Sequence, residues 1–149
     1  MKQNRLLLVV LALVTVIALT LTACGPVDKG PVTFTVKGLV NSELQLTDAG
    51  LHKMDVVTLT LEHPKKGALE YTGVRLNDLL NKAGIKSGAT TVTLTGSDGY
   101  TYDIDLATVQ ACTDCLITFD TENAGIYNAA MPGQSGKAWV SGIISIEVK

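Results

Sequence analysis

The chain contains the segment Tyr71-Thr72-Gly73-Val74-Arg75-Leu76-Asn77-Asp78-Leu79-Leu80-Asn81-Lys82-Ala83-Gly84, which carries its clearest helix signal. Apolar residues recur there at i, i+3, i+4 and i+7, the spacing that places side chains on one face of a helix. These residues are Leu76, Leu79, Leu80 and Ala83. Gly84 follows at the position where a glycine commonly ends a helix. We therefore expect a helix over 76–83 that packs its apolar face on a core.

Short strand-like segments make up most of the remaining chain. They alternate apolar with polar residues or are rich in β-branched residues, both of which are typical of strands. The expected strands cover 32–40, 56–61, 69–72, 91–95, 100–106, 116–119 and 139–148, and short helices are expected over 46–51 and 106–111. In the last strand, Ile144, Ile146 and Val148 are expected to face the core, and 124–136 is expected to be a loop. The pattern indicates an α+β fold with a strand-rich mixed or antiparallel sheet and about three short helices.

The first residues have the composition of an export signal. Lys2 and Arg5 are positive, and the run 6–21 that follows contains only two polar side chains. A basic start before such an apolar run is typical of a secretory signal, and the run is slightly shorter than the ~20 apolar residues of a membrane-spanning helix. The next residues resemble a bacterial lipobox: Leu21-Thr22-Ala23-Cys24. This resemblance implies cleavage before Cys24 and attachment of lipid to that cysteine.

These features divide the chain into an export signal over 1–23, a lipidated tether over 24–31 and a domain over 32–149. Proline and glycine residues keep the tether out of regular structure. Two or more acyl chains on Cys24 make membrane attachment stable. We therefore expect a lipid-anchored protein at the extracytoplasmic face of a cell membrane. The membrane is its expected partner, and a redox or transport partner at that membrane is left open.

Charge excludes one class of partner. Of 149 residues, 126 remain after the export signal is removed, which is enough for one domain with its own core. The full chain has 12 basic and 14 acidic residues, and the loss of Lys2 and Arg5 leaves 10 basic residues and a net charge of −4. Such a chain has no basic stripe to neutralise phosphates, so nucleic acid is not expected as a partner.

Cys112 and Cys115 form a CxxC pair that follows the expected helix over 106–111. A disulfide is chemically allowed outside the cytoplasm. A pair at the end of a helix favours a structural disulfide or inert thiols, because the helix dipole disfavours a thiolate there. Redox chemistry remains the alternative. A zinc site would need two more ligands, and the only histidines, His52 and His63, lack the paired spacing.

No catalytic group can be assembled from the residue pattern. The loop 133–137 has the glycines and lysine of an anion-binding loop, but it lacks the first glycine and the final Ser or Thr of a Walker A motif. A flexible turn with a solvated lysine is the simpler interpretation. Asp98, Asp103 and Asp105 do not have the spacing of an EF-hand.

Four segments resemble the sulfite-oxidase-like molybdopterin-binding domain in order and spacing. The residues 71–84 resemble its segment of an aromatic residue, Gly-Val and a Leu-Leu helix, and 98–100 resembles its central hairpin. The residues 37–48 resemble its opening strand and first helix, and 131–148 resembles its Pro-Gly loop and final strand. The resemblance covers about 32–149. It implies a fold that cradles a pterin-phosphate cofactor carrying molybdenum for oxidoreductase chemistry.

The resemblance implies seven cofactor-contacting residues: Gly73, Val74 and Arg75 near the pterin, Gly136 and Lys137 at its phosphate, and Tyr100 or Trp139 as a wall of the pocket. One departure affects the metal. The family holds molybdenum through a cysteine in a loop before the aromatic-Gly-Val segment, and the corresponding residues 61–68 contain no cysteine. Molybdopterin is therefore the implied cofactor, no metal ligand is assigned, and His63 is only an unusual substitute. Two readings stay open: a molybdenum-cofactor oxidoreductase, and a non-catalytic module that binds a ligand or a protein.

Overall fold

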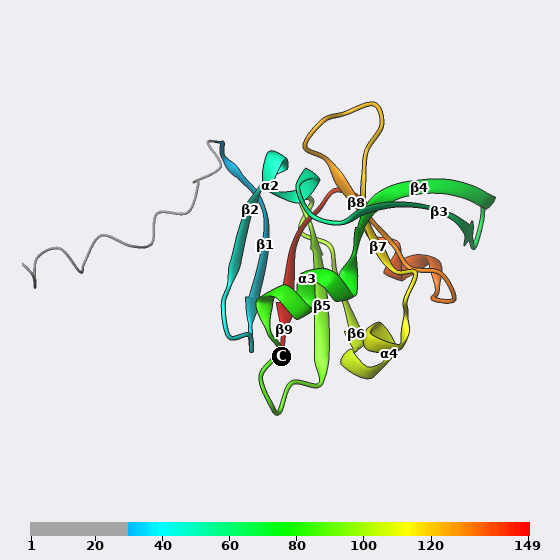
Figure 1. Ribbon diagram of the computed structural model, residues 1–149. Coiled ribbons are helices and arrows are strands. Elements are labelled where there is room, and N and C mark those ends of the chain that lie inside the picture. The colour runs from blue at the N-terminus through cyan, green and yellow to red at the C-terminus, as the bar shows by residue number, and fades with distance from the viewer. Residues whose placement is uncertain (1–29) are drawn as a thin grey trace, which may run out of the picture.

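The structure is a computed structural model that describes residues 30–149 (Figure 1). The predicted export signal, the lipobox and Cys24 lie outside the described residues. Within residues 30–149, no helix is both long and apolar enough to cross a membrane.

A five-stranded sheet forms one side of the domain. Its order is β2 (Leu44–Thr47), β1 (Val32–Gly38), β9 (Ile143–Val148), β5 (Thr91–Gly96) and β6 (Thr101–Asp105). β1 and β9 are parallel, with Val36 opposite Ile146, and the other neighbours are antiparallel. The sheet is therefore mixed, and the first and last strands of the domain lie side by side at its centre.

A second sheet has four strands and is antiparallel throughout. Its order is β3 (Val56–His63), β4 (Gly67–Arg75), β7 (Leu116–Phe119) and β8 (Tyr127–Ala130). β3 and β4 form a long hairpin that reaches away from the five-stranded sheet (Figure 1). This hairpin forms one wall of the groove described below.

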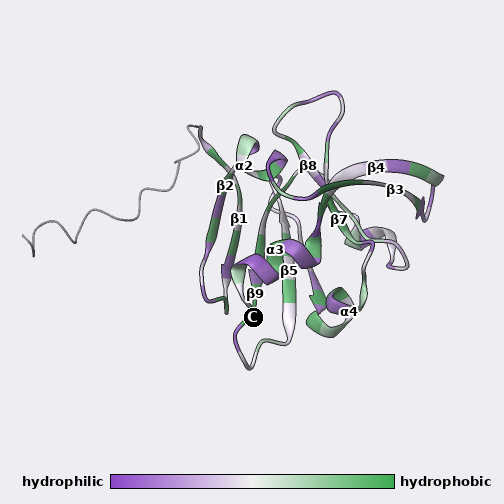
Figure 2. Ribbon diagram, viewed as in Figure 1, coloured by the Kyte–Doolittle hydropathy of each residue, from purple (hydrophilic) through white to green (hydrophobic). Residues whose placement is uncertain are grey.

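Short helices connect the strands of the described part: α2 (Asp48–His52), α3 (Leu76–Ala83), α4 (Leu106–Ala111) and the 3-10 helix η1 (Gly136–Ala138). The predicted helices over 76–83 and 106–111 are confirmed as α3 and α4. The apolar positions of α3 are buried, and hydrophilic residues (purple in Figure 2) lie between them. Gly84 ends α3 with φ 71°, a conformation that side-chain-bearing residues rarely adopt.

Two hydrophobic clusters lie on opposite faces of the four-stranded sheet. Leu116 and Ile117 are successive residues of β7, so their side chains point to opposite faces. Ile117 belongs to the main core, which also contains residues of the five-stranded sheet and of all three α-helices. Leu116 belongs to a smaller cluster with Leu61 and Ala130, against which Trp139 packs. The second cluster supports the groove.

The structure confirms the predicted α+β class and corrects several elements. Leu46 and Thr47 were expected in a helix, but both belong to β2, and Thr47 caps α2 by accepting a hydrogen bond from the Gly50 N–H. The expected loop 124–136 contains strand β8, because pairing with β7 outweighs the weak strand preference of its residues. The described residues form nine strands, and β2 and β8 are the two that the seven expected segments do not include.

The last strand is shorter than predicted, and its first residues turn a different side chain toward the core. β9 begins at Ile143, and residues 139–142, expected in the strand, form a bend and a turn after η1. Ile144 was expected to face the core but is 44% exposed, while Ile143 is fully buried. The cause is a register shift in the pairing of β5 with β9. Thr95 pairs with Ser145 and Gly96 pairs with Ile143, so Ile144 is an extra residue in β9 and interrupts the alternation of buried and exposed side chains.

Candidate functional site

A groove of about 870 Å³ runs between the β3–β4 hairpin and the β7–β8 connection. β4 contributes residues 69–72, the β7–β8 part contributes 118–121, 126, 128 and 129, and Trp139, Ser141 and Gly142 come from the segment before β9. Its lining combines aromatic rings, aliphatic side chains and hydroxyl groups with the charged side chains of Lys66, Glu70 and Asp120. A volume of this size suits a ligand or a short segment of chain.

Trp139 is the only tryptophan of the chain and lies in the wall of this groove. Its ring centroid is 4.6 Å from that of His63 and 5.5 Å from that of Tyr71. The indole Nε1 is buried and has no hydrogen-bond acceptor in the structure. An unpaired buried donor costs about 1–3 kcal/mol.

Tyr71 and His63 complete this aromatic cluster. Partial burial raises the pKa of the Tyr71 hydroxyl above its ordinary value. His63 Nδ1 accepts hydrogen bonds from the backbone N–H groups of Lys65 (3.1 Å) and Lys66 (3.2 Å). This occupies the Nδ1 lone pair and places the proton of the neutral ring on Nε2. Neither nitrogen of His63 then offers a free lone pair to a metal ion.

Gly73 and Val74, expected near a pterin, are buried within β4 and do not line the groove. Val74 is fully buried in the main core. Gly73 faces the backbone of β7, where a Cβ atom would collide with the carbonyl oxygen of Ile117 and lie 2.6 Å from Thr118 Cα. The glycine therefore permits the close approach of two strands.

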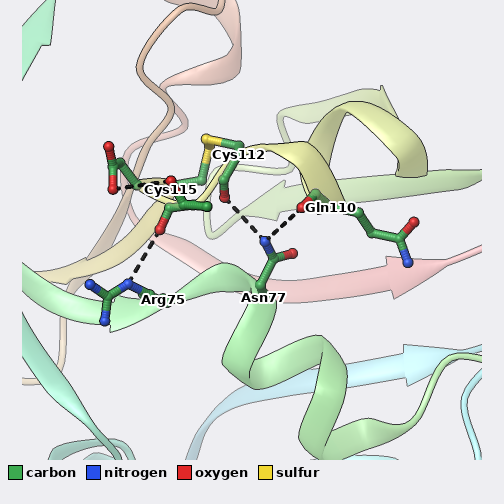
Figure 3. The surroundings of a disulfide bond; sticks show 7 residues. Arg75, Asn77, Gln110, Cys112 and Cys115 are labelled. Atoms are coloured by element: carbon green, nitrogen blue, oxygen red, sulfur yellow. Dashed lines mark hydrogen bonds between the residues drawn. A yellow bond between two sulfur atoms is a disulfide. The ribbon is translucent and has the colours of Figure 1, made fainter.

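Arg75 lies at the junction of β4 and α3, beside a disulfide between Cys112 and Cys115 (Figure 3). Arg75 Nε donates to Thr113 O at 3.3 Å, and Asn77 Nδ2 donates to Cys112 O at 3.1 Å. Cys115 is buried, and the pair follows the end of α4, where the helix dipole disfavours a thiolate. The disulfide thus holds a loop whose carbonyl groups anchor the start of α3.

Tyr100, Gly136 and Lys137 come together at a second place, around η1. Tyr100 Oη donates to the backbone oxygen of Lys137 at 3.1 Å, and Tyr102 Oη lies 3.3 Å from Ser135 Oγ. Gly136 and Lys137 are exposed, and none of these residues lines the groove. Of the seven residues expected at a cofactor, Trp139 alone lies in the groove wall.

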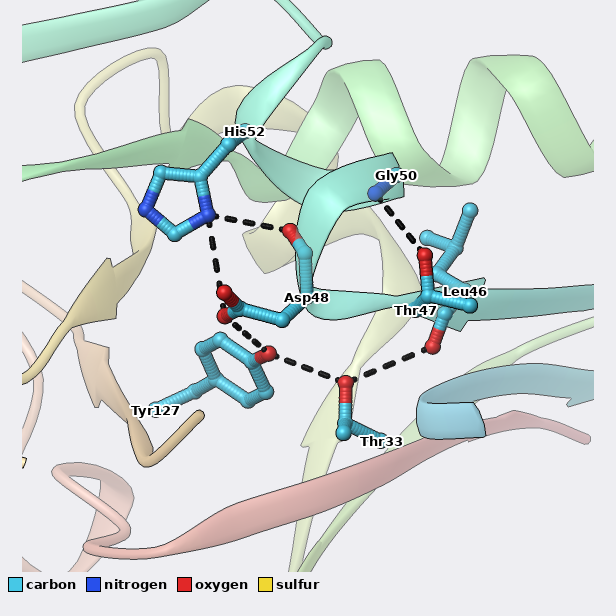
Figure 4. A network of polar contacts seen from close by, with 7 residues as sticks. All are labelled: Thr33, Leu46, Thr47, Asp48, Gly50, His52 and Tyr127. Atoms are coloured by element: carbon cyan, nitrogen blue, oxygen red, sulfur yellow. Dashed lines mark hydrogen bonds and ion pairs between the residues drawn. The ribbon is translucent and has the colours of Figure 1, made fainter. Parts of the chain in front are cut away.

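A polar network that no sequence motif signals joins α2 to β1 and β8 (Figure 4). Tyr127 Oη donates to Asp48 Oδ1 at 2.7 Å and lies 2.9 Å from Thr33 Oγ1. Burial raises the pKa of Tyr127 to about 12, and Asp48 adds to this rise as acceptor and negative charge. His52 Nδ1 lies 2.9 Å from Asp48 O, and its ring stacks on Phe119 at 3.9 Å. The network therefore braces the β7–β8 wall of the groove.

The two sheets, the short helices and the aromatic groove define a strand-rich α+β domain, and comparison with known proteins identifies its family. The family model described as "Oxidoreductase molybdopterin binding domain" matches residues 52–130, more than half of the chain. The chain belongs to this family, as its sequence resemblance implied. None of the curated proteins matches the chain.

Among solved structures, the domain is similar to the sulfane dehydrogenase SoxCD from Paracoccus pantotrophus, with a TM-score of 0.66 and 18% sequence identity. The alignment covers 83% of this chain and 40% of that chain. At this identity the likeness concerns the fold. The present chain corresponds to less than half the length of the chain it matches.

The residues present do not fit a molybdenum ligand set. The family resemblance implies one cysteine thiolate as the protein ligand to the metal, and residues 30–149 contain two cysteines, Cys112 and Cys115. Both cysteines of this range are joined in the disulfide, which leaves neither of them as a thiolate. His63, the substitute considered above, has Nδ1 occupied by two backbone donors.

Proposed function

We propose that the protein is a lipid-anchored extracytoplasmic member of the molybdopterin-binding family that works as a binding module without a molybdenum centre. Fold does not fix function, because a site can be lost while its scaffold persists. In this proposal the groove beside Trp139 is the binding site, and its occupant is a ligand or a partner protein.

The bonded state of the two cysteines of residues 30–149 is the observation that carries the proposal. A soft thiolate is the natural ligand for molybdenum in this fold, and Cys112 and Cys115 are bonded to each other. They also lie at the end of α4, away from the residues 61–68 where the family's metal-binding cysteine is expected.

The placement of the cationic side chains also supports this proposal. Arg75 contacts the disulfide loop, whereas Lys137 lies in η1 beside Tyr100. Neither residue lines the groove. A pterin phosphate in the groove would therefore lack the two cations that the family resemblance assigned to the cofactor, and Lys66 is the single lysine or arginine among the lining residues.

The anchor part of the proposal rests on the sequence. Cleavage before Cys24 leaves the tether over 24–31, and strand β1 begins at Val32. Each methylene of an acyl chain buried in the bilayer contributes about 0.8 kcal/mol, so two or more chains hold the domain at the membrane surface.

The test is the molybdenum content of the full chain purified from cells that make molybdopterin. A thiolate-containing member of the family, produced in the same cells, serves as the positive control. We expect the control to carry metal and this chain to carry far less than one molybdenum atom per molecule. Stoichiometric molybdenum in this chain would overturn the proposal in favour of a molybdenum-cofactor oxidoreductase.

A further inference from the structure

We infer that the groove binds an extended peptide segment of a partner protein, which adds as a strand to the open edge of β4. This inference rests on the proposed function, in which the domain is a binding module, and it names the chemical class of the occupant.

The open edge is defined by unequal pairing on the two sides of β4. On one side β4 pairs with β3 over its full length, from Gly67 to Val74. On the other side it pairs with β7 only through Gly73, Val74 and Arg75. The residues 68–72 therefore have a neighbouring strand on one side only. Alternate backbone N–H and C=O groups of this segment face away from β3, toward the space that β7 leaves free.

That space is the groove. β4 residues 69–72 form one wall, and the chain that leaves β7 forms the opposite wall with Phe119, Asp120, Thr121 and Ile126. The five residues of the open edge span about 17 Å at ~3.3 Å per residue, which is the length of an ordinary short strand. A peptide strand added antiparallel to β4 would pair with residues 68–72 on the same edge of β4 on which β7 pairs with Gly73, Val74 and Arg75.

The two walls offer apolar contacts to both faces of an added strand. Leu69 and Tyr71 are two residues apart in β4 and share a face, on which Tyr71 contacts Trp139. Phe119 lies two residues after the core residue Ile117 and points to the other face. Leu69 is 41% exposed and Ile126 is 42% exposed, so apolar surface is accessible at both walls. A peptide with apolar residues on both faces fits this arrangement.

The experiment uses phage-displayed random heptapeptides selected against the full chain in detergent micelles, with empty micelles as the background. Enriched peptides are then synthesised and titrated into the protein. Because Trp139 is the single tryptophan, intrinsic fluorescence reports directly on the groove. We expect enriched peptides that change the emission of Trp139.

Two comparisons test the mode of binding. Thr121→Arg fills the groove from its exposed wall, whereas Thr101→Arg makes the same exchange on the exposed edge of β6. We expect a loss of affinity of about tenfold or more for Thr121→Arg and little change for Thr101→Arg, since only the first blocks the hydrogen-bonded edge. Peptides N-methylated at odd or at even positions should differ, with one set losing binding and the other keeping it.

The inference is overturned if no peptide is enriched above the background, if Thr121→Arg binds as tightly as the parent, or if both N-methylated peptides bind equally. A tightly held small molecule that excludes peptides from the groove would overturn it too. These failures are distinct from failure of the proposed function. A molybdenum-free chain that binds no peptide removes only this inference, whereas stoichiometric molybdenum removes the proposed function itself.

Discussion

Replacing Tyr127 with phenylalanine removes one hydroxyl from the network that joins α2 to β1 and β8 and leaves the ring in place. The lost group donates to Asp48 at 2.7 Å and lies 2.9 Å from Thr33 Oγ1. A hydrogen bond to a charged acceptor contributes about 1.5–3 kcal/mol. The Asp48 side chain is 41% exposed and regains water in the variant, so the lower end applies. We expect Tyr127→Phe to lower the free energy of unfolding by about 1.5 kcal/mol at pH 7.

The difference between the two proteins should depend on pH. The pKa of Tyr127 rises from 10.0 to about 12 on folding, chiefly because the ring is buried. Below pH 10 this contribution to stability is fully present, and it is lost as the pH rises toward 12, because the unfolded chain loses the proton first. By pH 11 the loss is about 1.4 kcal/mol, which nearly cancels the advantage of the wild type over Tyr127→Phe.

Urea unfolding at pH 7, 9, 10 and 11, followed by circular dichroism, measures this difference. Tyr100→Phe is the matched control: the hydroxyl that it removes donates to Lys137 O at the exposed surface, where water can replace it, so stability at pH 7 should change by less than ~0.5 kcal/mol. A stability difference between wild type and Tyr127→Phe that stays constant from pH 7 to pH 11 would refute the reasoning. So would equal stability of the two proteins at pH 7.

Three further predictions follow from the backbone, the disulfide and the anchor. Gly73→Ala should lower the free energy of unfolding by about 3 kcal/mol, because the added Cβ would collide with β7. Gly136→Ala is the control and should cost less than ~0.5 kcal/mol, since the nearest atom to its added Cβ is 3.7 Å away. Similar urea midpoints for the two variants would contradict this prediction. Reduction of the disulfide between Cys112 and Cys115 should lower the free energy of unfolding by about 2 kcal/mol, a small value for a disulfide because the bond closes a very short loop. An unchanged urea midpoint in dithiothreitol would count against this prediction. Cys24→Ala should move the protein from the membrane to the soluble fraction after cell lysis, and retention at the membrane would argue against a lipid anchor.

The regular parts of the fold were predictable because their signals are local. The helix α3 follows from the spacing of its leucines and from Gly84, and its observed bounds are the predicted ones. β8 was missed because Tyr127-Asn128-Ala129-Ala130 has little strand preference of its own. It forms a strand because β7 offers it a partner. Ile144 was assigned to the core because the shift opposite Gly96 leaves no mark in the local sequence.

The groove could not be predicted because its walls come from distant parts of the chain. Tyr71 belongs to the segment that suggested the family, yet its neighbour in the groove, Trp139, lies far along the sequence. The bond between Tyr127 and Asp48 joins residues 79 positions apart. Gly73, Val74 and Arg75, which the family resemblance assigns to a cofactor, take part in strand packing and in the anchoring of α3. Such contacts depend on tertiary arrangement, which residue spacing alone does not specify.

The central claim is that this domain keeps the molybdopterin-domain fold without coordinating molybdenum. The most direct measurement is the ratio of molybdenum to protein in the full chain after purification from cofactor-producing cells, by elemental mass spectrometry. We predict a ratio close to that of a protein without a molybdenum site prepared in parallel. A ratio near one, with X-ray absorption showing the metal bound by a side chain of this domain, would contradict the account.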